Sequence, residues 1–67
     1  MDIFTIRLKE LRTEKGITQK ELAAELGTTD DSIYSWKKGR SQPSIDMMRQ
    51  MCNYFNVSAG YLLGLEE

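Results

Sequence analysis

The fold of this chain is decided by residues 19–38, which read QKELAAELGTTDDSIYSWKK. Thr18 precedes the stretch as a helix N-cap, and Glu21 follows it three residues later, which is the spacing of a capping box. The apolar positions that follow form one helical stripe: Leu22, Ala23 and Leu26. Gly27 can adopt the positive φ that a sharp helix end requires. The pattern predicts a first short helix over about residues 19–26.

A second short helix is expected directly after this glycine, over about residues 30–38. Thr28 or Thr29 would cap it, and its apolar positions are Ile33 and Trp36. Because these two residues lie three apart, they fall on one side of the helix and define its buried direction.

The spacing within the stretch is more specific than any one of its residues. A small residue lies four places after Gln19, a glycine eight places after it, and apolar residues fourteen and seventeen places after it. The small side chain of Ala23 lets the two helices cross closely. Two helices joined in this way by a short turn with glycine are typical of a helix-turn-helix. This motif usually places its second helix in the major groove of DNA.

Other pieces of the chain extend this pattern on both sides. They are residues 7–12 (RLKELR), 16–19 (GITQ), 21–23 (ELA), 26–27 (LG), 32–33 (SI), Gly39, 43–44 (PS) and 61–64 (YLLG). With these pieces, the stretch from Arg7 to Gly64 resembles the phage repressor and Cro-type helix-turn-helix family, often called Xre-type, and it preserves every spacing between helices. The resemblance implies a compact, all-α, five-helix repressor-like bundle.

The sequence itself predicts five helices. The first runs from about Ile3 to Lys15, the next two form the motif, the fourth follows the Ser44 N-cap and ends at Asn56, and Ser58 caps a short fifth helix. The inward face of the fourth helix reads Ile45, Met48, Met51, Cys52 and Phe55, while Met47 and Tyr54 lie on a second flank. The expected core is Leu8, Leu11, Ile17, Leu22, Ala23, Leu26, Ile33, Trp36, Met48, Met51, Phe55, Val57 and Leu62.

The length and composition predict one domain over residues 1–67 without enzymatic chemistry. A core of this size rarely supplies more than roughly 3–5 kcal/mol of net stability. Cys52 is the only cysteine, so neither a disulfide within the chain nor a cysteine-based zinc site can be assembled. There is no histidine, so the commonest general base and metal ligand is missing. We expect no cofactor, no small-molecule ligand and no metal. With no signal peptide or membrane span apparent, the expected compartment is the cytoplasm.

Charge is the main argument against a nucleic-acid partner, because DNA-binding domains usually carry a basic surface. The chain has a net charge of −1 and a pI near 5.4. The charges are nevertheless unevenly distributed. Residues 36–53 hold four basic side chains against Asp46 alone. This basic cluster begins at the end of the second motif helix, which favours phosphate contact over an ordinary solvated charge run.

Helical geometry selects the face of the second motif helix that would meet DNA. With Ile33 and Trp36 inside, the outward stripe is Asp31, Tyr34, Ser35 and Lys38, with Asp30 at the tip. The resemblance implies that Asp30, Asp31, Tyr34 and Ser35 face bases and that Gln19 binds a phosphate. The complete set of expected phosphate contacts is Gln19, Thr29, Lys38, Arg40, Ser41 and Gln42.

The chain departs from the family pattern at two of these positions and at Lys37. Asp30 and Asp31 stand where relatives often carry neutral or basic residues. One of them could accept a hydrogen bond from cytosine N4, or both could only complement the helix dipole. Asp30, nearer the helix end, is expected to act more like a cap. Lys37 stands where many relatives have a glutamate that pairs with the arginine matching Arg12, which would leave Arg12 free for solvent or phosphate.

Two other residues have a functional and a structural interpretation, and the structural one is favoured for both. Trp36 could stack on single-stranded bases, but its register with Ile33 places it in the core. Cys52 is expected to be a small buried hydrophobic residue rather than a redox sensor.

The sequence therefore favours a transcriptional regulator that binds a pseudo-palindromic operator as a homodimer. Tyr61, Leu63 and Leu65 are candidates for the dimer contact, although closure of the core explains them equally well. The alternative is a protein-interaction or antitoxin-like module that keeps the fold but binds DNA weakly. The acidic recognition helix and the low pI support this alternative.

Overall fold

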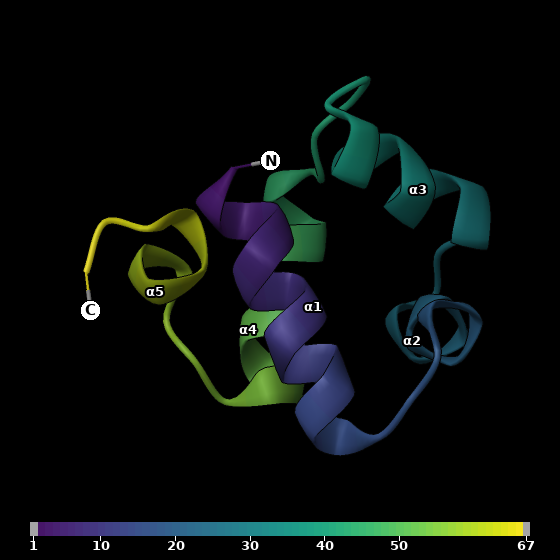
Figure 1. The fold of residues 1–67 in the computed structure, drawn as a ribbon, viewed down its shortest axis with the longest axis horizontal. Coiled ribbons are helices and arrows are strands. Elements are labelled where there is room, and N and C mark those ends of the chain that lie inside the picture. The colour runs from purple at the N-terminus through teal and green to yellow at the C-terminus, as the bar shows by residue number, and fades with distance from the viewer. Residues whose placement is uncertain (1, 67) are drawn as a thin grey trace.

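The computed structural model describes residues 2–66, in which five helices and no strands occur (Figure 1). The helices are α1 (Ile3–Lys15), α2 (Gln19–Leu26), α3 (Asp30–Lys38), α4 (Ile45–Phe55) and α5 (Ala59–Leu63). The predicted all-α class, the number of helices and their boundaries are confirmed. None of these helices is long and apolar enough to cross a lipid bilayer.

Local capping explains why each helix begins and ends where the sequence predicts. The Thr18 hydroxyl accepts from the Glu21 N–H at 3.1 Å, and the Glu21 carboxylate accepts from the Thr18 N–H at 2.8 Å. This second hydrogen bond holds the pKa of Glu21 below its ordinary value. Gly27 ends α2 with a φ of 70°, and Thr29 rather than Thr28 caps α3. The turn between the motif helices is therefore encoded within a few residues.

The five helices surround one small core. In Figure 1, α1 crosses the centre of the molecule in front of α4, with α2 and α3 on one side and α5 on the other. Packing of α2 against α3 and α4, and of α5 against α1 and α4, closes the structure. Four helices each contribute one of the large side chains that are fully buried: Leu22, Ile33, Met51 and Leu62.

The core matches the prediction in its centre and differs at its edge. Leu8, Leu22, Ala23, Leu26, Ile33, Trp36, Met51, Phe55 and Leu62 are buried. Four further predicted core residues are only half-buried and pack against this cluster: Leu11, Ile17, Met48 and Val57. Cys52 is half-buried as well, and this partial burial raises the pKa of its thiol.

Ile45 and Thr5 contradict the simple hydrophobic pattern. The prediction that Ile45 faces inward is wrong, because its side chain is 74% exposed. As the first residue of α4 it lies beside an open groove instead of beneath another helix.

Thr5 is buried although polar. Its N–H and hydroxyl both donate to the Asp2 carboxylate, at 3.0 and 2.8 Å, and lower the pKa of Asp2.

Gly64 offers a test of how α5 docks on α1. Its φ is +79°, and a Cβ built on it would lie 2.7 Å from Ile3 Cγ2, whereas Gly16 has a similar φ of +71° and open space around it. Both Gly→Ala substitutions should cost about 1–2 kcal/mol for the left-handed backbone. Gly64→Ala should cost roughly 1–3 kcal/mol more, because Ile3 must move. Thermal unfolding followed by circular dichroism would measure both. Equal losses would show that α5 does not pack on Ile3 this closely.

Candidate nucleic-acid interface

The helix α3 presents the face that the sequence predicts. Ile33 and Trp36 are buried, with exposures of 1% and 7%, so the inward side of the helix is confirmed. On the other side Asp30, Asp31 and Lys38 are exposed, and Tyr34 is 44% exposed. Ser35 is half-buried at the margin of this face. The residues predicted to face bases thus lie together on one surface of α3, as a recognition helix requires. Their contact with DNA stays a prediction.

A cluster of two cations and an aromatic ring lies at the C-terminal end of α3. The Lys38 ammonium is 5.5 Å from the centroid of the Tyr34 ring, and the Arg40 guanidinium carbon is 5.9 Å from it. Exposed contacts of this kind are worth about 0.5–1 kcal/mol each. We call Tyr34, Lys38 and Arg40 the α3 basic cluster. Its positive charges project from the same end of the helix and can reach an anion there.

The remaining residues predicted to contact phosphate differ in whether their polar groups already form hydrogen bonds within the protein. Ser41 and Gln42 are exposed in the loop between α3 and α4. The Thr29 hydroxyl donates to the Ser32 hydroxyl at 3.0 Å and accepts from the Ser32 N–H at 3.1 Å. Its hydrogen-bonding capacity is therefore largely used in capping α3.

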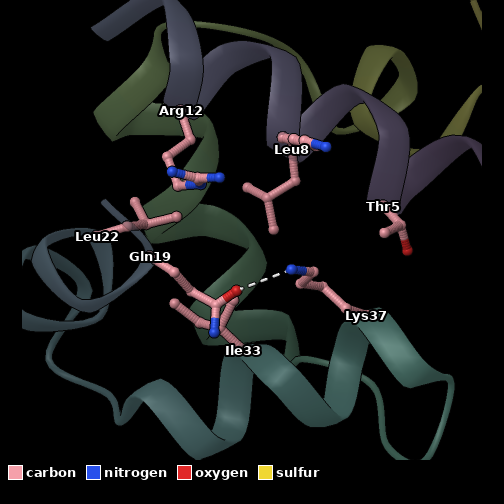
Figure 2. A pocket seen from close by; sticks show the side chains of 8 residues that line it. Thr5, Leu8, Arg12, Gln19, Leu22, Ile33 and Lys37 are labelled. Carbon is pink, nitrogen blue, oxygen red and sulfur yellow. Dashed lines mark hydrogen bonds between the residues drawn. The ribbon is translucent and has the colours of Figure 1, made fainter. Parts of the chain in front are cut away.

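Gln19 is held between the two ends of α3. Its side-chain oxygen accepts from the Lys37 ammonium at 3.1 Å (Figure 2), and its Nε2 donates to Asp30 Oδ1 at 2.8 Å. A longer contact of 3.4 Å joins Nε2 to the Asp30 carbonyl oxygen. The amide expected to bind phosphate is therefore engaged within the protein. Asp30 also does not act as a cap, because Thr29 fills that position.

Sequence reasoning missed Lys37 in this arrangement. In the sequence, Lys37 stands out only as a departure from the family pattern. A signal was nevertheless present, since Lys37 lies seven residues after Asp30 and two helical turns bring both side chains to the same side of α3. What the sequence could not supply is the crossing of α2 and α3, which places Gln19 between them.

These side chains surround a narrow crevice where α1, α2 and α3 meet (Figure 2). Its free volume is about 10 Å³, which is close to the space that one water molecule needs. Leu8, Leu22 and Ile33 line its apolar part, and the polar side chains around it are Thr5, Lys9, Arg12, Gln19 and Lys37. Three of these polar side chains are cations, Lys9, Arg12 and Lys37, and the space between them is too small for a phosphate group.

Arg12 is not free, contrary to the prediction from the loss of its glutamate partner. Its Nη1 donates to the Ile17 carbonyl oxygen at 2.8 Å. This carbonyl lies in the turn between α1 and α2, outside either helix, and the guanidinium supplies it with a donor. Arg12 therefore braces the start of the motif, and further N–H groups of its guanidinium remain for other acceptors.

The three candidates for a dimer contact lie in different environments. Tyr61 is half-buried, and the Arg7 guanidinium carbon lies 4.3 Å from the centroid of its ring. Arg7 also donates to the carbonyl oxygens of Tyr61 and Glu66 and so ties α1 to the end of the chain. Leu63 and Leu65 are 46% and 79% exposed. Packing on the core therefore explains the partly buried ring of Tyr61, but it does not explain the two exposed leucines.

An apolar groove lies next to Leu63. It has a volume of about 340 Å³ and lies between the start of α1, the loop after α3, and the start of α4. Its apolar lining consists of Phe4, Trp36, Pro43, Ile45, Met48 and Leu63. The exposed leucine and the exposed Ile45 thus belong to one continuous surface.

Comparison with known sequences relates this chain to transcriptional regulators. Residues 5–67 match a protein family described as a helix-turn-helix domain. The regulator ImmR of Bacillus subtilis is 38% identical over 61 residues, which cover 91% of this chain and 48% of ImmR. The activator BcrR of Enterococcus faecalis is 33% identical over 64 residues, covering 96% of this chain and 31% of BcrR. The match therefore covers less than half the length of either relative.

Comparison with solved structures agrees with the fold. The P22 c2 repressor, solved in complex with a synthetic operator, superposes with a TM-score of 0.84 over 98% of this chain and 100% of that one. The two sequences are 20% identical. At this identity the likeness concerns the fold, and it confirms the predicted repressor-like arrangement of helices.

Proposed function

The chain belongs to the helix-turn-helix family matched by residues 5–67, and from this premise we propose that it binds double-stranded DNA and regulates transcription. The family resemblance found in the sequence is confirmed by this match. The observation that carries the proposal is α3 itself. Its apolar side is buried on the core, and its opposite side is exposed and ends in the α3 basic cluster.

In this proposal α3 enters the major groove, which is wide enough to admit a helix. Asp30, Asp31, Tyr34 and Ser35 face base edges, with Ser35 limited to a shallow approach by its partial burial. Lys38 and Arg40 are the principal phosphate anchors, because both are exposed and cationic. The exposed loop residues Ser41 and Gln42 provide secondary contacts. Thr29 and Gln19 contribute only through the hydrogen-bonding capacity that their contacts within the protein leave over.

We further propose that two copies bind a pseudo-palindromic operator. A single module of this size buries too little DNA for high affinity, and a two-fold pair matches two half-sites about one helical turn apart. The exposed Leu63 and Leu65, together with the adjacent apolar groove, support a contact between copies on this side. We place this activity in the cytoplasm and assign it to one domain that includes residues 1–67.

An electrophoretic titration on mixed-sequence DNA at two salt concentrations tests DNA binding. Binding that weakens steeply with salt is expected, because phosphate contacts release counterions. Selection from a random DNA pool would then identify the operator. Absent or salt-insensitive binding would instead favour a protein-interaction or antitoxin-like module. That alternative is supported by the pI of 5.4 and by the two aspartates that begin α3.

Asp31→Asn should strengthen binding to all DNA by a few-fold. The exposed carboxylate lies on the face that approaches phosphates, and its removal ends a repulsion of about 1 kcal/mol or less in a solvated site. Glu10→Gln is the control, since Glu10 is also an exposed acid but lies on α1, beside Tyr61. The titration above would measure both variants. Equal effects of the two substitutions would remove Asp31 from the interface.

A further inference from the structure

We propose that Lys37 is a positioning residue for base recognition. Through the Gln19 amide it fixes the Asp30 carboxylate as an acceptor that selects cytosine at one position of each half-site. This inference rests on the proposed function and assigns a specific task to the hydrogen bonds that join these three side chains.

The chemistry of the three side chains permits one arrangement of the amide. An ammonium group only donates hydrogen bonds, and an ionised carboxylate only accepts them. Gln19 offers one oxygen and one NH₂ group, so its oxygen must face Lys37 and its nitrogen must face Asp30. The opposite orientation would place oxygen against oxygen at Asp30 and nitrogen against nitrogen at Lys37. Lys37 therefore determines which end of the amide Asp30 meets.

The three residues lie at separate points of the fold. We call this hydrogen-bonded set of Lys37, Gln19 and Asp30 the clamp. Asp30 begins α3, Lys37 lies in its last turn, and Gln19 begins α2. One amide thus connects the N-terminus of α2 to both ends of α3. Gln19 is half-buried above Ile33 and Leu22 at the crevice, which limits the rotamers open to its side chain.

The clamp leaves Asp30 with one oxygen for DNA. Gln19 occupies Oδ1 at 2.8 Å, and within residues 2–66 no protein donor contacts Oδ2. Asp30 is exposed, so this second oxygen is open to a partner. A carboxylate oxygen can accept from the amino group of cytosine or adenine, but adenine places its N7 acceptor beside that group. Repulsion from N7 favours cytosine, and thymine and guanine present acceptor oxygens that the carboxylate rejects.

Removing Lys37 should therefore weaken discrimination between bases, although Lys37 itself need not touch a base. Without its donor, the Gln19 oxygen loses its fixed partner, and the Asp30 carboxylate is free to turn into solvent. The net value of one such hydrogen bond corresponds to about three- to tenfold in an equilibrium constant. We expect the preference for cytosine over thymine to fall by that factor.

The test compares the full chain with three variants on two DNAs. One DNA carries the selected operator, and the other has thymine in place of cytosine at the position whose preference Asp30→Asn abolishes. Lys37→Met removes the donor, Lys37→Arg keeps a donor-only cation, and Lys38→Met removes the same charge from the neighbouring residue outside the clamp. The measured quantity is the ratio of the two dissociation constants for each protein.

The proposal requires a smaller ratio for Lys37→Met, an unchanged ratio for Lys37→Arg, and for Lys38→Met a loss of affinity that is equal on both DNAs. Circular dichroism would establish that each variant is folded. A wild-type ratio in folded Lys37→Met, or a loss of the ratio in Lys37→Arg as well, would overturn the proposal while DNA binding stands. If no protein in the series, including the wild type, binds either DNA, the proposed function fails and this inference fails with it.

Discussion

Trp36→Ala is expected to unfold the domain. The indole is 7% exposed and belongs to the single core cluster. Truncating a buried tryptophan to alanine typically costs about 3–5 kcal/mol, since apolar contact is lost and a cavity remains. A core in a chain of this size supplies roughly 3–5 kcal/mol in total. One substitution therefore removes about as much stability as the whole fold possesses.

Two measurements check this expectation. Circular dichroism of Trp36→Ala should show loss of helix at temperatures where the wild type is folded. The intrinsic emission of the wild type, which comes from its only tryptophan, should be shifted to the blue when folded. Tyr34→Ala is the control, because it truncates a 44% exposed ring on the same helix and should cost far less. Red-shifted emission from a folded wild type would place Trp36 on the surface and contradict the register of α3.

The helices could be predicted from sequence because their ends are encoded locally. The capping box at Thr18 and Glu21, and the glycine that follows α2, each act over three or four residues. No knowledge of the tertiary structure is needed to place such signals. The buried direction of α3 was equally accessible, because two apolar residues on one short helix define it.

The predictions that were wrong or incomplete concern side chains whose surroundings depend on how other parts of the chain pack against their helix. The Gln19 amide contacts Lys37 and Asp30 only because α2 crosses α3 at its own N-terminus. Arg12 finds the Ile17 carbonyl only because the chain turns back after α1. Ile45 fits the apolar period of α4 but has no neighbouring helix above it. Periodicity states which side of a helix is apolar, and the packing of other elements decides how much of that side is covered.

The difference matters for the candidate site. The sequence assigned Gln19 to a phosphate and Asp30 to a base edge or to the helix terminus, one residue at a time. In the structure the two side chains are hydrogen-bonded to each other, so neither can change its role without the other. The exposed cations of the α3 basic cluster are different, because they form no hydrogen bond with other side chains in the part of the chain that the structure describes. Their contribution to binding can therefore be predicted from charge alone.

Replacing Lys38 and Arg40 together by alanine should weaken DNA binding about thirtyfold at physiological salt. Each phosphate contact contributes about 0.9 to the slope of log affinity against log salt concentration, which corresponds to roughly 5.5-fold per contact between 1 M and 0.15 M salt. Both side chains are exposed, and each would release its own counterion at a phosphate, so the two losses should add in free energy although both cations lie near Tyr34. The loss should be the same on operator and scrambled DNA, because phosphates carry no sequence.

The slope of log affinity against log salt concentration tests this prediction most directly. The magnitude of the slope should fall by about 0.9 for either single variant and by about 1.8 for the double variant. Lys15→Ala removes an equal charge from the last turn of α1, away from the α3 basic cluster, and should leave the slope unchanged. Titrations at several salt concentrations on both DNAs would measure every slope. A double variant that kept the wild-type slope but preferred a different base would show that Lys38 or Arg40 reads sequence instead of holding phosphate.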